Sequence, residues 1–239
     1  MIKINIQDII FLDIETVSQL SSFEELSKNM QKLWEKKSQY FATNESSPKI
    51  IYQEKAGIYA EFGKVICISI GYISFNGNEK IYRIKSLAGN NEKKILTDFK
   101  SILLRFCEKG VKTLCAHNGK EFDFPYLIRR MLINRIDLPP ILQVFGKKPW
   151  EVPFLDTMEM WKFGDYKNYT SLELLSTIFD LPSPKDDIDG SMIGHIYWAD
   201  KDLDRIVKYC KKDTLAVAQL LLRYLGKYAI SEKNIEYIK

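Results

Sequence analysis

The segment from Ile9 to Glu15 is the feature that most constrains the fold of this chain. It contains Ile-Ile-Phe-Leu-Asp-Ile-Glu, so β-branched and apolar residues fall on both faces of the strand that it predicts. A strand that is apolar on both faces is typical of the centre of a sheet that is covered on each side. The segment therefore predicts a layered α/β architecture with a buried central strand.

The following patterns alternate between strand and helix. Two strand-like runs within about 64–85 flank Asn76-Gly77-Asn78, which is a good hairpin signal. Short strands are expected at 113–116 and 154–156, and helices at 91–109, 124–134, 171–179, 190–198 and 200–225. This order predicts a mixed sheet of about five strands with helices on both faces.

Residues 17–60 interrupt that order, and we expect a helical insertion there within a single domain that spans residues 1–239. Ser22 and Glu25 form a capping-box pattern, and apolar residues then recur at helical spacing, which predicts a helix near 22–40. The polar stretch Thr43 to Lys49 predicts a loop. An amphipathic helix of this kind commonly packs on the core, and a lid or a partner surface is the alternative.

Composition limits the function only weakly. The net charge of +4 and the isoelectric point of about 8.7 are compatible with a nucleic-acid partner but too mild to indicate one. The four cysteines show no CxxC pair and no metal-finger spacing, and Cys67 and Cys115 lie in apolar runs, as reduced core cysteines do. The longest apolar stretch, near 65–75, is too short and interrupted to cross a bilayer, and no signal sequence is apparent. We therefore expect a cytoplasmic protein with no membrane partner.

Acidic residues interrupt the apolar patterns at two remote places. Asp13 and Glu15 are two residues apart on the first strand, so both side chains leave the same face. Tyr209 and Asp213 are four residues apart on the last long helix, so they also share a face, and apolar residues continue the same stripe. Burial of a bare carboxylate costs several kcal/mol unless it is paired or bound to a cation. A strand end that emerges into solvent would explain the first pair, and a salt bridge would explain the second.

A third acid, Asp123, precedes Phe124-Pro125 at the expected start of a helix. Asp is a favoured N-cap and Pro is favoured in the first turn, so this residue alone is explained by capping. Asn118 follows a buried strand and is equally compatible with an ordinary turn.

Together, however, three segments resemble the three exonuclease motifs of the DEDD superfamily of 3′–5′ exonucleases. These segments are Phe11-Leu12-Asp13-Ile14-Glu15-Thr16, residues 116–127 from Ala116 to Leu127, and Tyr209-Cys210-Lys211-Lys212-Asp213. They are similar to the tyrosine (DEDDy) subclass and to the proofreading exonuclease domain of family-B DNA polymerases. The histidine subclass would place its histidine five residues before the last acid, where this chain has Lys208. Residues 183–192 also resemble stand-alone relatives of that domain. The resemblance covers most of the chain except about 17–60 and the last dozen residues, and it implies an RNase H-like sheet.

The resemblance also implies a function. Asp13, Glu15, Asp123 and Asp213 would hold two Mg²⁺ ions, with Mn²⁺ as a substitute, and Tyr209 would orient the attacking water. Asn118 and Phe122 match positions that face the 3′ end of the substrate, and Lys185 is a weaker candidate for a phosphate contact. The implied reaction hydrolyses the terminal phosphodiester of single-stranded DNA and releases nucleoside 5′-monophosphates. Because no polymerase body follows Asp213, we expect a free-standing exonuclease or one that works with a separate polymerase or repair partner.

Other interpretations stay open at the level of sequence. An exonuclease acting on RNA would use the same residues, and an RNase H-like endonuclease would use the acids without needing Tyr209, Asn118 or Phe122. A non-catalytic nucleic-acid-binding module on the same fold would be signalled by loss of an acid, and none is missing. A purely structural role for all the acids, as caps and salt bridges, is the fourth alternative. We interpret His117 as a structural residue at a strand end and His195 as a helix-surface residue.

Overall fold

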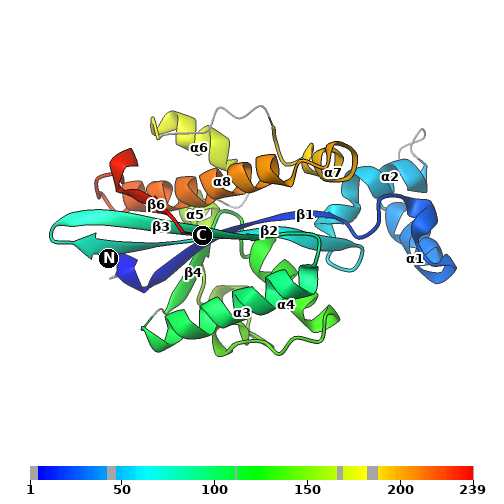
Figure 1. Ribbon diagram of the computed structural model, residues 1–239, viewed down its shortest axis with the longest axis horizontal. Coiled ribbons are helices and arrows are strands. Elements are labelled where there is room, and N and C mark those ends of the chain that lie inside the picture. Colours follow the sequence, from blue (N-terminus) through cyan, green and yellow to red (C-terminus); the bar gives the residue numbers. More distant parts are fainter. Residues whose placement is uncertain (1–4, 42–46, 111, 166–168, 182–187, 239) are drawn as a thin grey trace.

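The computed structural model describes residues 5–41, 47–110, 112–165, 169–181 and 188–238. Within these residues, six strands form one mixed sheet in the order β5-β4-β1-β2-β3-β6 (Figure 1). The strands are β1 Ile9–Ser18, β2 Gly63–Asn76, β3 Glu79–Ala88, β4 Thr113–Ala116, β5 Leu155–Asp156 and β6 Ile235–Tyr237. Strands β1, β2 and β3 are antiparallel neighbours, whereas β4, β5 and β6 join by parallel pairing. The mixed α/β prediction is confirmed, and the strand beyond the expected five is β6.

Helices cover both faces of the sheet (Figure 1). Helices α3 (Glu92–Glu108) and α4 (Asp123–Ile133) lie on one face, and the long α8 (Leu203–Tyr224) lies on the other. The face of α8 also carries α5 Thr157–Lys162, α6 Leu172–Ile178 and α7 Ile193–His195, which a π-helix at Ile196–Asp200 continues. Single 3₁₀ turns lie at Ile6–Asp8, Phe23–Glu25, Ala56–Ile58, Pro140–Leu142, Pro149–Glu151 and Glu232–Asn234. Helices α1 (Lys28–Ser38) and α2 (Pro48–Lys55) lie together at one end of the sheet.

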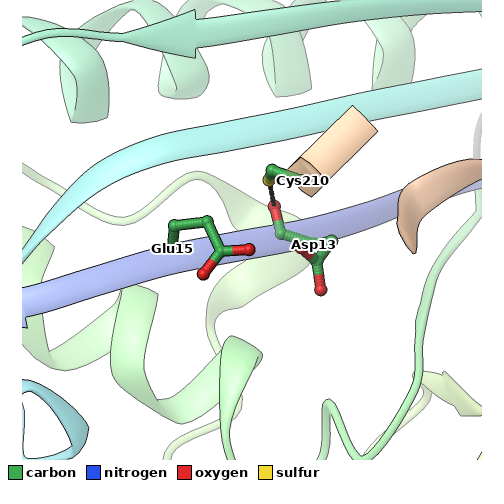
Figure 2. A group of neighbouring side chains, drawn as sticks. All are labelled: Asp13, Glu15 and Cys210. Carbon is green, nitrogen blue, oxygen red and sulfur yellow. Dashed lines mark hydrogen bonds between the residues drawn. The ribbon is translucent and has the colours of Figure 1, made fainter. Parts of the chain in front are cut away.

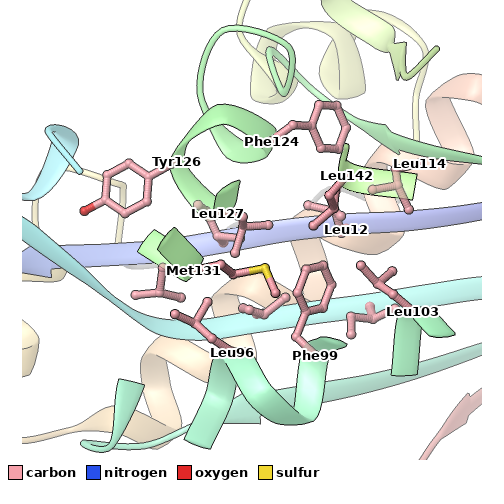
Figure 3. Close-up of a cluster of buried hydrophobic side chains, with 14 of the residues drawn as sticks. Leu12, Leu96, Phe99, Leu103, Leu114, Phe124, Tyr126, Leu127, Met131 and Leu142 are labelled. Atoms are coloured by element: carbon pink, nitrogen blue, oxygen red, sulfur yellow. The ribbon is translucent and has the colours of Figure 1, made fainter. Parts of the chain in front are cut away.

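The alternation along β1 decides which way its side chains point. Leu12 packs into the main core, where the sheet meets α3 and α4 (Figure 3). Phe11 belongs instead to the cluster under α8, with Val217 and Leu221. Because successive side chains of a strand point to opposite faces, Asp13 and Glu15 follow Phe11 to the α8 face. The two predicted acids are therefore directed at the helix that carries Tyr209 and Asp213.

A bulge lies beside these acids. Glu15 pairs with Cys67, but Thr16 pairs with Val65, so Ile66 is an extra residue in β2. As a result, the consecutive residues Ile66 and Cys67 both join the cluster under α7 and α8, whereas Val65 joins the main core. Bulges re-aim side chains and are frequent next to active sites.

The segment 17–60 differs in detail from its prediction. Ser22 makes no capping bond, and α1 is capped by Ser27, whose hydroxyl accepts a hydrogen bond from Met30 N at 3.4 Å. The capping-box prediction is wrong because the chain forms a short 3₁₀ turn first and restarts as a helix at Lys28. Residues 43–46 of the predicted loop lie outside the described residues, and its last two residues, Pro48 and Lys49, already belong to α2.

Helix α2 was missed, since it is only eight residues long and follows a polar stretch. The segment has a small core of its own, in which the rings of Trp34 and Tyr52 meet edge-on at 5.4 Å. Across the described part of the chain, no helix combines the length and apolar character needed to cross a membrane.

Candidate active site

A cavity of about 850 Å³ opens beside the second half of β1, under α8. Its walls come from β1, the loop between β4 and α4, the end of α2, the α7 region and α8. Seven predicted site residues line it: Asp13, Glu15, Asn118, Phe122, Asp123, Tyr209 and Asp213. The eighth, Lys185, lies outside the described residues. We call this space the acidic cavity, because Glu54 also lines it and no Lys or Arg does among the residues described.

Asp13 and Glu15 lie next to each other on β1, with Cys210 of α8 beside them (Figure 2). Potential ligand atoms of Asp13, Glu15 and Cys210 all lie within 4.8 Å of one another. The Cys210 thiol, however, donates a hydrogen bond to the backbone carbonyl of Asp13 at 3.4 Å, as the dashed line in Figure 2 shows. The Cys210 side chain thus joins α8 to the backbone of β1 at the floor of the site.

Burial and mutual repulsion raise the pKa values of these acids. Burial raises the pKa of Asp13 well above its usual range, and the charges of Asp213 and Asp123 raise it further. Burial does the same to the pKa of Glu15, with the charge of Asp13 next in importance. Burial raises the pKa of Asp123 to about 7, with repulsion from other acids added. The carboxylates from β1, α4 and α8 therefore share one electrostatic environment that disfavours full ionisation without a counter-charge.

The turn after β4 places Asn118, Phe122 and Asp123. Asn118 has a left-handed backbone with φ +57°, which Asn tolerates better than most residues. A Cβ on Gly119 would lie 2.4 Å from the Cβ of Ala116, so the close approach of this turn to β4 requires glycine. Phe122, not Asp123, occupies the N-cap position of α4, and α4 has no side-chain cap there. The capping interpretation of Asp123 is therefore wrong, and its carboxyl is buried with 3% exposure.

Asp156, at the end of β5, is a buried acid that sequence reasoning missed. Its Oδ1 accepts hydrogen bonds from the backbone N–H of Asn118 at 3.0 Å and of Met158 at 2.9 Å. Its Oδ2 accepts from Lys120 N at 3.0 Å, so the carboxylate ties the Asn118 turn to the start of α5. The available signal was an Asp after a short strand and before a helical pattern, which is the pattern of an N-cap.

Helix α8 carries Tyr209 and Asp213 one turn apart, on the face toward the acidic cavity. The helix starts at Asp202, whose side chain accepts a hydrogen bond from Arg205 N at 3.0 Å. Burial raises the pKa of Tyr209 far above its usual value, with the charge of Asp213 next in importance. The phenol therefore stays protonated at neutral pH and can donate a hydrogen bond.

His117 lies at a strand end and His195 on a helix surface, as expected from the sequence, although both also line the cavity. The ring nitrogens of His117 lie 2.9 Å from the Thr157 hydroxyl and 2.9 Å from the Thr170 carbonyl, so both are engaged at the strand end. Burial lowers the pKa of His117, which keeps the ring neutral. His195 is exposed at the end of α7, with its Nε2 3.4 Å from a carboxylate oxygen of Asp200.

The segment 17–60 supplies a wall that the sequence did not predict. The carbonyl of Gly57 accepts hydrogen bonds from the hydroxyls of Thr16 and Tyr126, each at 2.8 Å. These bonds anchor the 3₁₀ turn that carries Ile58, whose side chain is 52% exposed and lines the cavity. The wall is therefore fixed to both β1 and α4.

The donor set of the acidic cavity fits a divalent cation. Asp13 Oδ2 and Asn118 Oδ1 are buried and have no hydrogen-bond partner among the described residues. Carboxylate and amide oxygens suit Mg²⁺ or Mn²⁺, whereas a thiol is a soft ligand. Burial also raises the pKa of Cys210 well above its ordinary range, so the thiol stays protonated. The oxygens of Asp13 and Glu15 thus form an acidic group that can hold a metal ion.

Fold and site together define an α/β protein with an acidic, metal-compatible cavity beside its central strand. Residues 51–224, most of the chain, match the RNase H superfamily, and the chain belongs to that superfamily. The matched range begins after Asp13 and Glu15. Nucleases of this fold are typically hydrolytic enzymes, so the family indicates a nuclease.

Solved structures share the fold, and one of them does so at low sequence identity. It is the family B DNA polymerase from the hyperthermophilic archaeon Pyrobaculum calidifontis, with a TM-score of 0.56 and 12% identity. The similarity covers 91% of this chain but 24% of the polymerase chain, so this chain spans about a quarter of that protein. No curated protein matches the sequence significantly.

Proposed function

We propose that this protein is a metal-dependent 3′–5′ exonuclease of the tyrosine (DEDDy) subclass, with residues 1–239 as a single exonuclease domain. The observation that carries the proposal is the convergence of side chains from β1, α4 and α8 on one cavity. Those side chains are Asp13, Glu15, Asp123, Tyr209 and Asp213. Their order and spacing along the chain match the motifs of the subclass.

The four carboxylates would hold two Mg²⁺ ions, with Mn²⁺ as a substitute. When bound, such cations lower the pKa of water and stabilise negative charge on the departing 3′ oxygen. Four ionised carboxylates and two divalent cations carry equal and opposite charge, which relieves the repulsion that raises the pKa values of Asp13 and Glu15. Because no Lys or Arg of the described residues lines the cavity, the cations would also be the main attraction for substrate phosphate.

Tyr209 acts as a hydrogen-bond donor in this proposal. Its phenol has an unperturbed pKa of about 10 and a still higher one in this site, so it is a poor base at neutral pH. It would orient the attacking water beside the scissile phosphodiester. In-line attack on the last linkage would release a nucleoside 5′-monophosphate.

The substrate would be the 3′ end of single-stranded DNA. The terminal nucleotide must leave a duplex to reach acids on the floor of a cavity. The Phe122 ring offers a surface on which a base can stack, and Asn118 offers a buried oxygen with no partner among the described residues. DNA is chosen over RNA on the resemblance to polymerase proofreading domains.

A 5′-labelled oligonucleotide tests the proposal. With Mg²⁺ or Mn²⁺, single-stranded DNA should give a descending ladder of products, and chelation should stop the reaction. Asp13→Asn should give no ladder while keeping a cooperative thermal transition. Internal cuts would instead indicate an endonuclease, and a ladder from RNA alone would reassign the substrate. Absence of cation-dependent cleavage of DNA or RNA would overturn the proposal.

A further inference from the structure

A second cavity, of about 440 Å³, lies on the opposite face of the sheet, between α3 and strands β2 and β3. Its floor is apolar and is formed by Ile70, Tyr72, Ile102 and Phe106, whereas the side chain of Ile84, which also borders the cavity, packs into the cluster under α8. Its rim is basic and is formed by Arg83, Lys85, Arg105 and Lys109, with Ile238 beside them. We call it the basic groove. Figure 1 shows that α3, which supplies one side of the groove, lies on the face of the sheet away from α8.

The rim of the groove carries an excess of basic side chains. It presents four basic side chains and no acid among its described lining residues, and Lys85 already has an interaction partner of its own. Arg83 is partly neutralised, since its Nε donates a hydrogen bond to Glu236 at 2.6 Å. Arg105 and Lys109 are exposed, and Arg105 Nε contacts a carbonyl of its own helix, that of Ser101, at 3.3 Å. The rim therefore keeps positive charge that can attract an anionic ligand.

The floor offers a recess for an apolar side chain. The rings of Tyr72 and Phe106 meet edge-on at 4.8 Å, and Ile102 closes the bottom with 8% exposure. An apolar recess with charged groups at its edge is the arrangement in which a buried side chain supplies affinity and charge supplies orientation. A ligand that satisfies both halves carries a bulky apolar residue next to several carboxylates.

We propose that the basic groove binds a short acidic peptide segment of a partner protein. The apolar side chain of the peptide occupies the recess, and its carboxylates face Arg105 and Lys109. A nucleic-acid strand fits less well, because the sheet separates the groove from the acids that would act on a 3′ end. The proposal does not depend on the proposed exonuclease function, and an occupied groove leaves the acidic cavity open.

Fluorescence anisotropy with labelled synthetic peptides tests this proposal. The probe is Asp-Asp-Glu-Asp-Leu-Phe, and the comparison probes are Lys-Lys-Lys-Lys-Leu-Phe, Asp-Asp-Glu-Asp-Gly-Ser and a single-stranded oligonucleotide. The double variant Arg105→Glu/Lys109→Glu should weaken binding of the first probe by about tenfold or more. The matched control, Lys32→Glu/Lys36→Glu on the exposed face of α1, changes the net charge equally and should bind the probe as wild type does.

A third variant separates the recess from the rim. Phe106→Ala should weaken binding of the Leu-Phe probe but not of the Gly-Ser probe, since only the first places a side chain in the floor. Equal loss in the α1 control would mean general charge attraction and would overturn the proposal. So would a loss confined to the oligonucleotide, which would make the groove a nucleic-acid surface, or undetectable peptide binding by the wild type.

Discussion

The acidic cavity and the basic groove share one sheet but lie on its two faces. Asp13 of the cavity pairs with Ser69 of β2, and the next residue of β2, Ile70, lies on the floor of the groove. A single step along the strand thus separates a surface suited to cations from one suited to anions. Strand alternation lets a small sheet keep two opposite charge environments apart with no additional layer.

The two regions differ in how much water surrounds their charges. Glu15 and Asp123 are buried at 7% and 3% exposure, whereas Arg105 and Lys109 are exposed. Like charges in water repel weakly, but like charges in a buried site repel strongly unless a counter-ion is present. The groove therefore tolerates its own repulsion, whereas the acids of the cavity need a counter-charge before all of them can ionise.

Asp123→Asn should have the largest effect on activity and should separate the two regions most clearly. The amide keeps the size of the side chain but removes a charge, so we expect nuclease turnover to fall on the order of 10²–10³-fold. The same change should stabilise the metal-free protein above about pH 7, because burial raises the pKa of Asp123 to about 7. Turnover assays and thermal melts in chelator measure both effects.

The matched control is Arg105→Glu/Lys109→Glu, which should leave trimming of single-stranded DNA unchanged. If the groove variant lost as much turnover as Asp123→Asn, the assignment of catalysis to the acidic cavity alone would be wrong.

Tyr209→Phe should have the next largest effect. It removes one hydroxyl from the acidic cavity and leaves the ring, so turnover should fall by about 10²-fold while KM stays close to that of wild type. Metal affinity should not change, because the phenol is not one of the proposed ligands. Steady-state kinetics with a titration of Mn²⁺ would show this, and an unchanged kcat would remove Tyr209 from the mechanism.

The central strand and the last helix were predictable because their patterns are local. In the run from Ile9 to Glu15, successive side chains point to opposite faces of the strand, so Asp13 and Glu15 share one face. The four-residue spacing of Tyr209 and Asp213 places both on one face of α8. A strand and a helix each fix side-chain direction within a few residues, so the face that carries each acid follows from sequence. The meeting of those faces at one cavity was inferred from a resemblance and could not be derived from spacing.

The features that were missed depend on contacts between remote segments. Asp156 makes its bonds to a turn that is 36 and 38 residues away in the sequence, and nothing in its own neighbourhood indicates that turn. The wall at Gly57 depends on the Tyr126 hydroxyl, 69 residues away. The basic groove combines α3 with β2 and β3, so its charge is visible only after the strands are in register.

Asp156→Asn should moderately reduce stability and nuclease activity at the acidic cavity, and it should leave peptide binding at the basic groove unchanged. The amide nitrogen cannot accept the hydrogen bond that one carboxylate oxygen receives from Lys120 N, so the variant should lose about 1–3 kcal/mol of stability. The turn with Asn118 should loosen, and kcat/KM should fall about tenfold, mostly through KM. Kinetics and denaturant unfolding check these values, and Asp180→Asn on an exposed turn is a matched control. A loss of stability with unchanged KM would make Asp156 a capping residue only.

The smallest expected effect is the pH dependence of the stability of the metal-free protein, and it is specific to the buried acids of the cavity. Burial raises the pKa of Asp123 from its ordinary range near 3.9 to about 7, so between these values the folded chain binds protons more tightly than the unfolded chain. The stability that this acid supplies is therefore complete at low pH and is lost as pH rises through about 7, and Asp13 and Glu15 act in the same direction.

His117 acts in the opposite direction, since burial lowers its pKa, so the wild type must be compared with Asp123→Asn. From about pH 5.5 to about pH 8, one such acid changes stability by about 2 kcal/mol, or roughly 4–8 °C in melting temperature. Over this pH range, we expect the melting temperature of the wild type in chelator to fall by this amount relative to that of Asp123→Asn. Addition of Mg²⁺ should restore it. The groove variant Arg105→Glu/Lys109→Glu should follow the wild type. A wild-type melting temperature that rises with pH relative to Asp123→Asn would show that the cavity does not hold its acids in the protonated form.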